Sequence, residues 1–137
     1  MRLFLDTSAL VAIEDLNDSN HSKALTLREQ IRRGDTPFRT LFTSNYVVDE
    51  VITLLRFHCG HHVALAFRRA LDASKLVRVL WVTEPIEKAA WARFQKRTDK
   101  AYSFTDCTSF ALMDAEAIRS SFTFDQHFSQ EGYNVVP

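Results

Sequence analysis

The chain has 137 residues, 46% hydrophobic and 25% charged, and its seventeen basic and seventeen acidic side chains give a net charge of zero. Eleven Phe, two Trp and three Tyr exclude a disordered chain, and the length fits one domain, which we expect to span residues 1–137. Zero charge excludes a polybasic nucleic-acid-binding tail, but it leaves open a protein whose charges are unevenly distributed.

The first half of the chain alternates short apolar runs with helical patterns. The predicted order is a strand at 2–5, a helix ending at 13, a polar loop at 15–20, a helix at 22–33, a strand at 38–43 and helices at 45–59 and 62–73. Ser44 is predicted to cap the helix at 45–59, and Gly34 and Gly60 each follow the end of a helix.

The second half continues the alternation. It is predicted to contain a strand at 76–82, a helix from Thr83 to Arg97, a helix at 103–115, a strand at 120–124 and an edge strand at 133–136. Strands that alternate with helices favour an α/β fold with a parallel sheet.

Two predicted strands end on an acid, one at Asp6 and one at Asp125. Ligands of parallel α/β sheets bind at the carboxyl ends of the strands. We therefore expect both carboxylates at one edge of the sheet. Each also has a simpler interpretation, since Asp commonly ends a strand and starts a turn.

Glu50 and Asp49 are adjacent on one predicted helix but face different ways. Glu50 follows Val47 by three residues and precedes Leu54 by four, so it lies with the apolar face, whereas Asp49 lies on the polar side. A carboxylate on an apolar face is costly unless it is paired, protonated or bound to a metal. Glu50 therefore indicates a function and Asp49 does not.

Asp106 begins a predicted helix on the same face as Phe110. Its simpler interpretation is a capping box with Ser103, in which an acid in the first turn stabilises the helix. If Asp6, Glu50, Asp106 and Asp125 converge, they repel one another unless a cation neutralises them. Carboxylate oxygens select Mg²⁺ or Mn²⁺, and such ions support phosphodiester hydrolysis.

Four short segments, at 5–10, 47–51, 103–107 and 122–125, resemble the PIN-domain family in sequence. Their order and spacing are similar to those of VapC-type ribonuclease toxins, over essentially the whole chain. The resemblance implies a three-layer α/β/α sandwich around a central, mainly parallel sheet of four to five strands. It also implies a ribonuclease in which Asp6, Glu50, Asp106 and Asp125 are the catalytic residues and the ligands of Mg²⁺ or Mn²⁺.

The family pattern further implies that Thr7 or Ser8, together with Thr105, orients water or ligands. Many relatives carry another acid shortly after the last aspartate, whereas Gln126 and His127 follow it here. His127 is close enough in sequence to reach a phosphate or a metal-bound water, but a turn histidine at the rim of the site is the simpler interpretation.

The resemblance implies an RNA substrate, a cognate antitoxin and a homodimer. The segment 87–100 has a net charge of +3 and is a candidate RNA contact. Four apolar residues of the first two helices suit a dimer interface or an antitoxin groove: Leu10, Ile13, Leu25 and Leu27.

Two other functions stay open. One is a PIN-like scaffold that binds RNA or protein without cutting it, and the other is a phosphoacceptor receiver domain, which lacks support because Asp6 has no acidic neighbour. The early Asp6 is foreign to a signal peptide, no apolar run approaches the ~20 residues of a membrane span, and Cys59 and Cys107 show no metal spacing. We expect a cytoplasmic, reduced protein without a membrane partner.

Overall fold

The computed structural model describes residues 1–137, which form five strands and seven helices. In chain order they are β1 (Arg2–Leu5), α1 (Thr7–Glu14), α2 (His21–Arg33), β2 (Thr40–Ser44), α3 (Asn45–His58), α4 (His61–Ala73), β3 (Val77–Leu80), α5 (Glu84–Lys96), α6 (Phe104–Ala115), β4 (Ser120–Phe122), α7 (His127–Gln130) and β5 (Asn134–Val136). No helix combines the length and the apolar character needed to cross a membrane, and both cysteines are free thiols.

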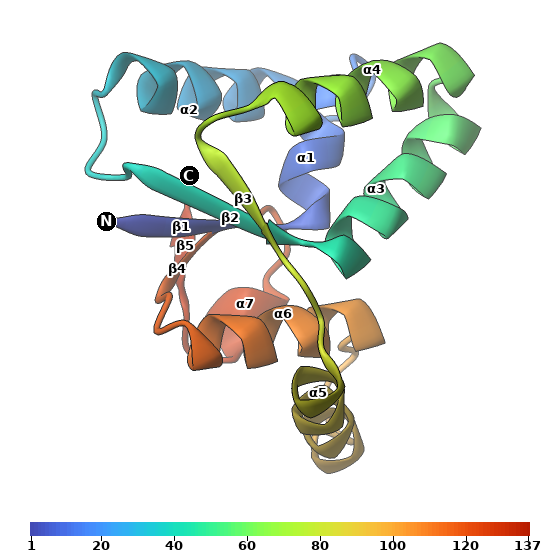
Figure 1. The fold of residues 1–137 in the computed structure, drawn as a ribbon, viewed down its shortest axis with the longest axis vertical. Helices are drawn as coiled ribbons and strands as arrows, with labels where there is room; N and C mark the ends of the chain where they lie inside the picture. The colour runs from blue at the N-terminus through green and yellow to red at the C-terminus, as the bar shows by residue number, and fades with distance from the viewer.

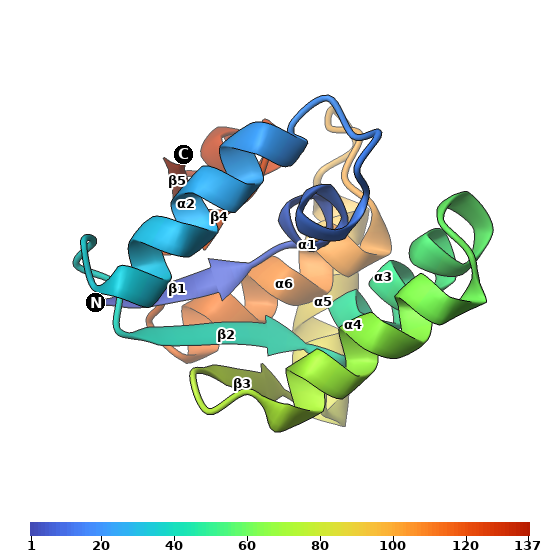
Figure 2. The same cartoon turned by 90° about the horizontal axis from the view of Figure 1, so that it is seen from above.

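The five strands form one sheet in the order β3-β2-β1-β4-β5, and every pairing is parallel. Helices α1 to α4 cover one face of the sheet and α5 to α7 cover the other (Figures 1 and 2). The predicted α/β/α sandwich with a central parallel sheet is thus confirmed.

The central strand β1 is buried because helices cover both of its faces. Leu3 and Phe4 are fully buried and Leu5 is 5% exposed, and they belong to a core of 29 buried residues. An apolar run without alternation is the pattern expected of such a strand. The edge strand β3 is only partly buried, since one of its sides has no neighbouring strand.

The order in which strands are added to the sheet changes direction at the boundary between β1 and β4. From β1 the chain moves outward through β2 to β3, and then returns to β4 and β5 on the other side of β1. The backbone N–H of Asp6 donates to the carbonyl of Phe122, 3.1 Å away, so the ends of β1 and β4 lie side by side. Such a switch point is where open α/β sheets place their ligands.

Two predicted strands are longer than the strands that form. The segment 76–82 contributes only Val77–Leu80, because the N–H of Val82 turns aside to donate to Oδ1 of Asn45 at 2.7 Å. The segment 120–124 ends at Phe122, because Oγ1 of Thr123 accepts from the N–H of Asp125 at 2.9 Å and bends the chain.

Asp125 therefore stands three residues beyond β4 rather than directly at its end, which corrects the prediction from sequence. It is followed by α7, a short helix that the sequence analysis did not predict. The carboxylate of Asp125 accepts from the N–H of His127 at 2.9 Å, and this turn starts the helix.

Candidate functional site

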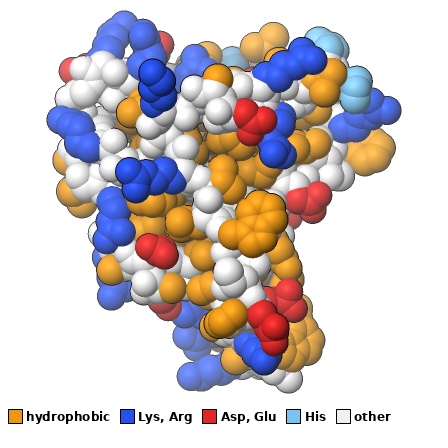
Figure 3. Space-filling view, viewed as in Figure 1, with side chains coloured by type: hydrophobic (Ala, Val, Ile, Leu, Met, Phe, Trp, Pro, Cys, Tyr) orange, Lys and Arg blue, Asp and Glu red, His pale blue; other side chains and the backbone are white.

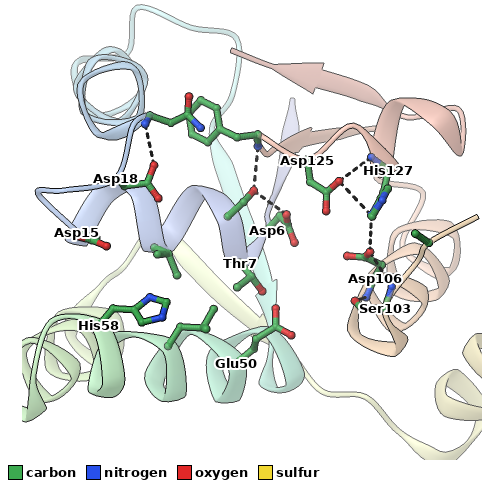
Figure 4. A pocket seen from close by; sticks show the side chains of 16 residues that line it. Asp6, Thr7, Asp15, Asp18, Glu50, His58, Ser103, Asp106, Asp125 and His127 are labelled. Carbon is green, nitrogen blue, oxygen red and sulfur yellow. Dashed lines mark hydrogen bonds and ion pairs between the residues drawn. The ribbon is translucent and has the colours of Figure 1, made fainter.

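A pocket of about 420 Å³ opens at the carboxyl edge of the sheet, above the switch point (Figure 4). Its walls come from α1, α3, the start of α6 and the segment after β4. All four acids selected from the sequence line it: Asp6, Glu50, Asp106 and Asp125. The expectation that these acids share one pocket thus agrees with the structure, although they come from parts of the chain more than 100 residues apart.

Asp6 is the most deeply placed of the four acids, with 3% of its surface exposed. Its side chain makes no capping bond to α1, so the carboxylate is not used to start that helix. Instead Oδ2 accepts from the hydroxyls of Ser8 at 3.0 Å and Thr123 at 2.8 Å. Burial raises the pKa of Asp6 to about 6, against the effect of these hydroxyls and with a further contribution from the charge of Asp106.

The hydroxyls of Ser8 and Thr123 connect Asp6 to the loop that carries Asp125. They lie 3.1 Å apart, and Oγ of Ser8 also accepts from the N–H of Phe124 at 3.0 Å. The Thr123 hydroxyl accepts from the N–H of Asp125 in the same way. Thr123 was missed as a site residue in the sequence, where its only signal is a hydroxyl between a strand and an acid.

Asp106 has both of the roles weighed from the sequence. Its Oδ2 accepts from the N–H of Ser103 at 3.1 Å, and the Ser103 hydroxyl accepts from the N–H of Asp106 at 2.9 Å, which completes the capping box. The carboxylate also lines the pocket. Burial raises the pKa of Asp106, and the neighbouring charge of Asp125 adds to that rise.

His127 lies between two of the acids rather than at the rim of the site. Its Nδ1 is 3.0 Å from Oδ2 of Asp106 and 3.1 Å from Oδ1 of Asp125. One ligand atom from each of these three residues lies within 4.8 Å of the others, which makes them the only such group of acids, histidines or cysteines in the chain. Asp6 and Glu50 line the same pocket but lie outside this close group.

Glu50 faces the pocket from α3, the helix that also carries His58 (Figure 4). It is partly buried, while the neighbouring Asp49 is exposed, as the helical pattern predicts. The Glu50 carboxylate has no hydrogen bond or ion pair within the protein, so it is available to a ligand in the pocket.

The two threonines proposed as accessory residues lie in different places. Thr7 lines the pocket and is 7% exposed, and its buried hydroxyl has no hydrogen-bond partner. Thr105 is not part of the lining. The far end of the pocket contains three polar residues of the loop predicted at 15–20 and one at the end of α3: Asp15, Asp18, Asn20 and His58.

The donor set fits a hard divalent cation. Carboxylate and hydroxyl oxygens dominate the lining, no cysteine contributes, and the Thr7 hydroxyl and the Glu50 carboxylate lack partners within the protein. No lysine or arginine lines the pocket, and burial together with the neighbouring carboxylates raises the pKa of Asp6 and Asp106. A bound cation would supply the missing positive charge.

The fold and the site together define the PIN domain, and the PIN domain family matches residues 3–131. The chain belongs to this family. It is 36% identical over 134 residues, 98% of its length, to the 23S rRNA-specific endonuclease VapC20 of Mycobacterium tuberculosis, of which it covers 97%. The crystal structure of that protein, described as a sarcin-ricin loop cleaving toxin, superimposes with a TM-score of 0.85 over 96% of this chain and 95% of that one.

Two more distant structures share the fold. VapBC2 from Rickettsia felis, bound to a DNA fragment from its promoter, gives a TM-score of 0.69 at 12% identity, with 99% of this chain and 98% of that one covered. FitAcB from Neisseria gonorrhoeae gives 0.69 at 16% identity, with 98% and 96% covered.

Proposed function

We propose that this protein is a metal-dependent endoribonuclease and the toxin of a type II toxin–antitoxin pair. The observation that carries the proposal is the pocket itself, in which acids from four separate parts of the chain meet with too little positive charge to neutralise them. Full-length identity of 36% to a 23S rRNA-specific endonuclease supports RNA as the substrate.

The residues that would hold the cation are Asp6, Glu50, Asp106 and Asp125. Mg²⁺ or Mn²⁺ bound there supplies positive charge to a phosphoryl oxygen and makes a bound water more acidic. The Thr7 hydroxyl, buried beside Asp6 without a partner, is an additional oxygen donor.

The other side chains of the site keep the acids in place. The hydroxyl groups of Ser8 and Thr123 each donate a hydrogen bond to the Asp6 carboxylate and hold it in place. Nδ1 of His127 spans Asp106 and Asp125, so the imidazole fixes the separation of these two carboxylates. The Glu50 carboxylate, which has no partner within the protein, is free to bind the cation or to accept a hydrogen bond from water in the pocket.

The partners follow from the same family membership. A toxin of this kind requires a cognate antitoxin, and we propose that such a protein and a second copy of this chain bind it. We propose the cytoplasm as the location of the protein, because both an RNA substrate and an antitoxin would be present there.

The test is cleavage of RNA by the purified protein. We expect Mn²⁺ or Mg²⁺ to support cutting of 23S rRNA, mapped by primer extension, and we expect EDTA to abolish it. Asp6→Asn and Asp125→Asn are expected to lower the rate by roughly 100-fold or more, because each removes a charge from the ion-binding set. Asp49→Asn, on the exposed side of α3, is the matched control.

The same assay separates the enzyme from a non-catalytic PIN-like scaffold. A scaffold would leave every RNA intact with either metal, and its Mn²⁺ affinity, measured by calorimetry, would not depend on all four acids. Cleavage that persists unchanged in Asp6→Asn would point to a contaminating nuclease and would overturn the proposal.

A further inference from the structure

A second hollow, of about 440 Å³, adjoins the acidic pocket. The two hollows share the segment 100–103 as a wall: Ala101 and Ser103 line the acidic pocket, whereas Lys100 and Tyr102 line the second hollow. The rest of its lining comes from the end of α5 and the turn after it: Trp91, Phe94, Gln95, Arg97 and Thr98. We call it the aromatic hollow.

Two aromatic rings form a fixed platform in the aromatic hollow. Trp91 and Phe94 are 52% and 40% exposed, and their rings lie 5.7 Å apart with an interplanar angle of 14°. The edge of Phe104, the first residue of α6, packs against both at 6.2 and 6.1 Å. The rings are therefore held in place by the protein and yet offer surface to a ligand.

Basic and polar groups accompany these rings. Lys100 lines the aromatic hollow and lies 3.9 Å from the exposed Asp99 carboxylate, while Arg97 lines it with its charge paired to Glu131. Gln95 and Thr98 add an amide and a hydroxyl to the wall. Figure 3 shows hydrophobic side chains reaching the surface in the region of α5, with Lys and Arg side chains nearby. An aromatic face combined with cations is the arrangement that single-stranded nucleic acid uses, since bases stack on rings and phosphates pair with Lys or Arg.

Tyr102 connects the aromatic hollow to the acids. Its ring lies 5.3 Å from the imidazole of His127, at an angle of 64°, and its hydroxyl is 3.4 Å from the Glu131 carboxylate. Glu131 in turn pairs with Nε of Arg97 at 3.0 Å. A ligand in the aromatic hollow therefore lies one side chain away from the residue that spans Asp106 and Asp125.

We propose that the aromatic hollow is a subsite for an unpaired nucleobase next to the phosphate that is cut. The inference rests on the proposed function, because it assumes that RNA enters the acidic pocket. A base stacked on Trp91 holds the strand across the shared wall, and Lys100 neutralises a flanking phosphate. The aromatic hollow then selects RNA that is single-stranded or distorted at this position.

Fluorescence of Trp91 tests this directly, without cleavage. Trp81 and Trp91 are the only tryptophans, so Trp81→Phe leaves Trp91 as the single reporter. We expect a single-stranded pentaribonucleotide, in EDTA, to quench this fluorescence to saturation. In calorimetric titrations, which do not need the Trp91 signal, Trp91→Ala should weaken binding of the oligonucleotide roughly 10-fold, and Trp91→Phe should restore most of it. Trp81 is a more exposed tryptophan outside the aromatic hollow, and Trp81→Ala should leave this binding unchanged.

A set of pentamers with one abasic position each provides the second arm. One position should weaken binding to the wild-type protein about as much as Trp91→Ala does, and it should have no further effect in the Trp91→Ala variant. If the effects of the missing base and of Trp91→Ala are not additive, then the base at that position stacks on the Trp91 ring. The loss of affinity that an abasic position causes in the wild-type protein does not depend on how the variant folds.

Three outcomes would overturn the subsite. One is binding that ignores both Trp91→Ala and every abasic position, and another is the absence of quenching. The third is a change of oligomeric state in Trp91→Ala by sedimentation, which would make the aromatic face an interface between two copies. Quenching of Trp91 by RNA that is never cleaved would refute the nuclease activity and keep the subsite. RNA cleavage at an unchanged rate in Trp91→Ala would keep the nuclease activity and refute the subsite.

Discussion

Two regions of the molecule gather carboxylates, and they differ in what neutralises them. In the acidic pocket, Asp6 and Asp106 have raised pKa values and a histidine is the nearest nitrogen base. Where α5 packs against α6 and the end of α7, Asp114 and Glu131 pair with the guanidinium groups of Arg93 and Arg97. We call these four residues, with Tyr133, the α5 clamp.

The carboxylates of the α5 clamp already have positively charged and hydrogen-bonding partners within the protein. Arg93 contacts Asp114 at 2.5 Å and Tyr133 at 3.2 Å, and it lies over the ring of Phe110. The Tyr133 hydroxyl donates to Asp114 at 2.6 Å. Acids with a permanent cationic partner hold elements together, whereas acids without one depend on a cation from solution. The contrast indicates that the α5 clamp is structural and the pocket is functional.

The largest expected effect on stability is in the α5 clamp. Arg93→Met removes the cation and leaves Asp114 and the mostly buried Glu131 with one partner fewer. We expect unfolding free energy to fall by about 3 kcal/mol, measured by urea denaturation.

Arg68→Met is the matched control for Arg93→Met, because its pair with Asp72 is exposed on both sides and should contribute less than about 0.5 kcal/mol. Equal losses in the two variants would erase the distinction between the α5 clamp and an ordinary surface pair.

The second expected effect is a gain in stability when the Asp6 carboxylate is removed. The folded protein binds the Asp6 proton more tightly than the unfolded chain does, since burial raises the pKa of Asp6 to about 6 from its ordinary value of 3.8. This contribution to stability is therefore complete below about pH 4 and is lost as the pH rises through 6. In EDTA at pH 8, Asp6→Asn should be about 2 kcal/mol more stable than the natural protein.

The difference in stability between Asp6→Asn and the natural protein should shrink toward zero at pH 4, where the Asp6 side chain in the folded protein is neutral like the Asn that replaces it. Thermal melts at the two pH values measure it. A large loss of stability in Asp6→Asn at pH 8 would show that the carboxylate is a structural element like Asp114, and the comparison of the two regions would fail.

The smallest expected effect on stability is at Glu50. Because its carboxylate has no partner within the protein, Glu50→Gln should change the unfolding free energy by less than about 0.5 kcal/mol. Mn²⁺ affinity should nevertheless fall, by roughly 10-fold or more, in a calorimetric titration. A variant that loses stability but keeps its affinity for Mn²⁺ would place Glu50 with the α5 clamp residues.

Much of the fold could be predicted because periodicity and caps are local. The buried run at β1, the Ser44 cap of α3 and the capping box of Ser103 and Asp106 all formed as the sequence indicated. The errors fell where a side-chain hydrogen bond, rather than the periodicity, decides where a strand ends. Val82 leaves its strand for Asn45, and Thr123 ends β4 through a bond that no periodicity reveals.

The candidate site divides in the same way. Asp6 and Asp125 could be selected because each follows a predicted strand, Glu50 because it lies on an apolar helix face, and Asp106 through its place in the motifs of the family, and all four line the pocket. The sequence could not reveal that Thr123 donates to Asp6, or that Nδ1 of His127 spans two acids. These contacts depend on which strands are neighbours, since β1 and β4 are separated by more than 110 residues.

The sequence by itself determined the alternation of strands and helices, the absence of a polybasic tail and the four acids that required an explanation. Only the tertiary structure decided that the acids face one cavity, that arginines neutralise a second set of acids, and that an aromatic hollow adjoins the first. The physical reason is that charge and burial act through space. A carboxylate has its pKa set by the groups packed around it, and parallel pairing alone brings those groups together.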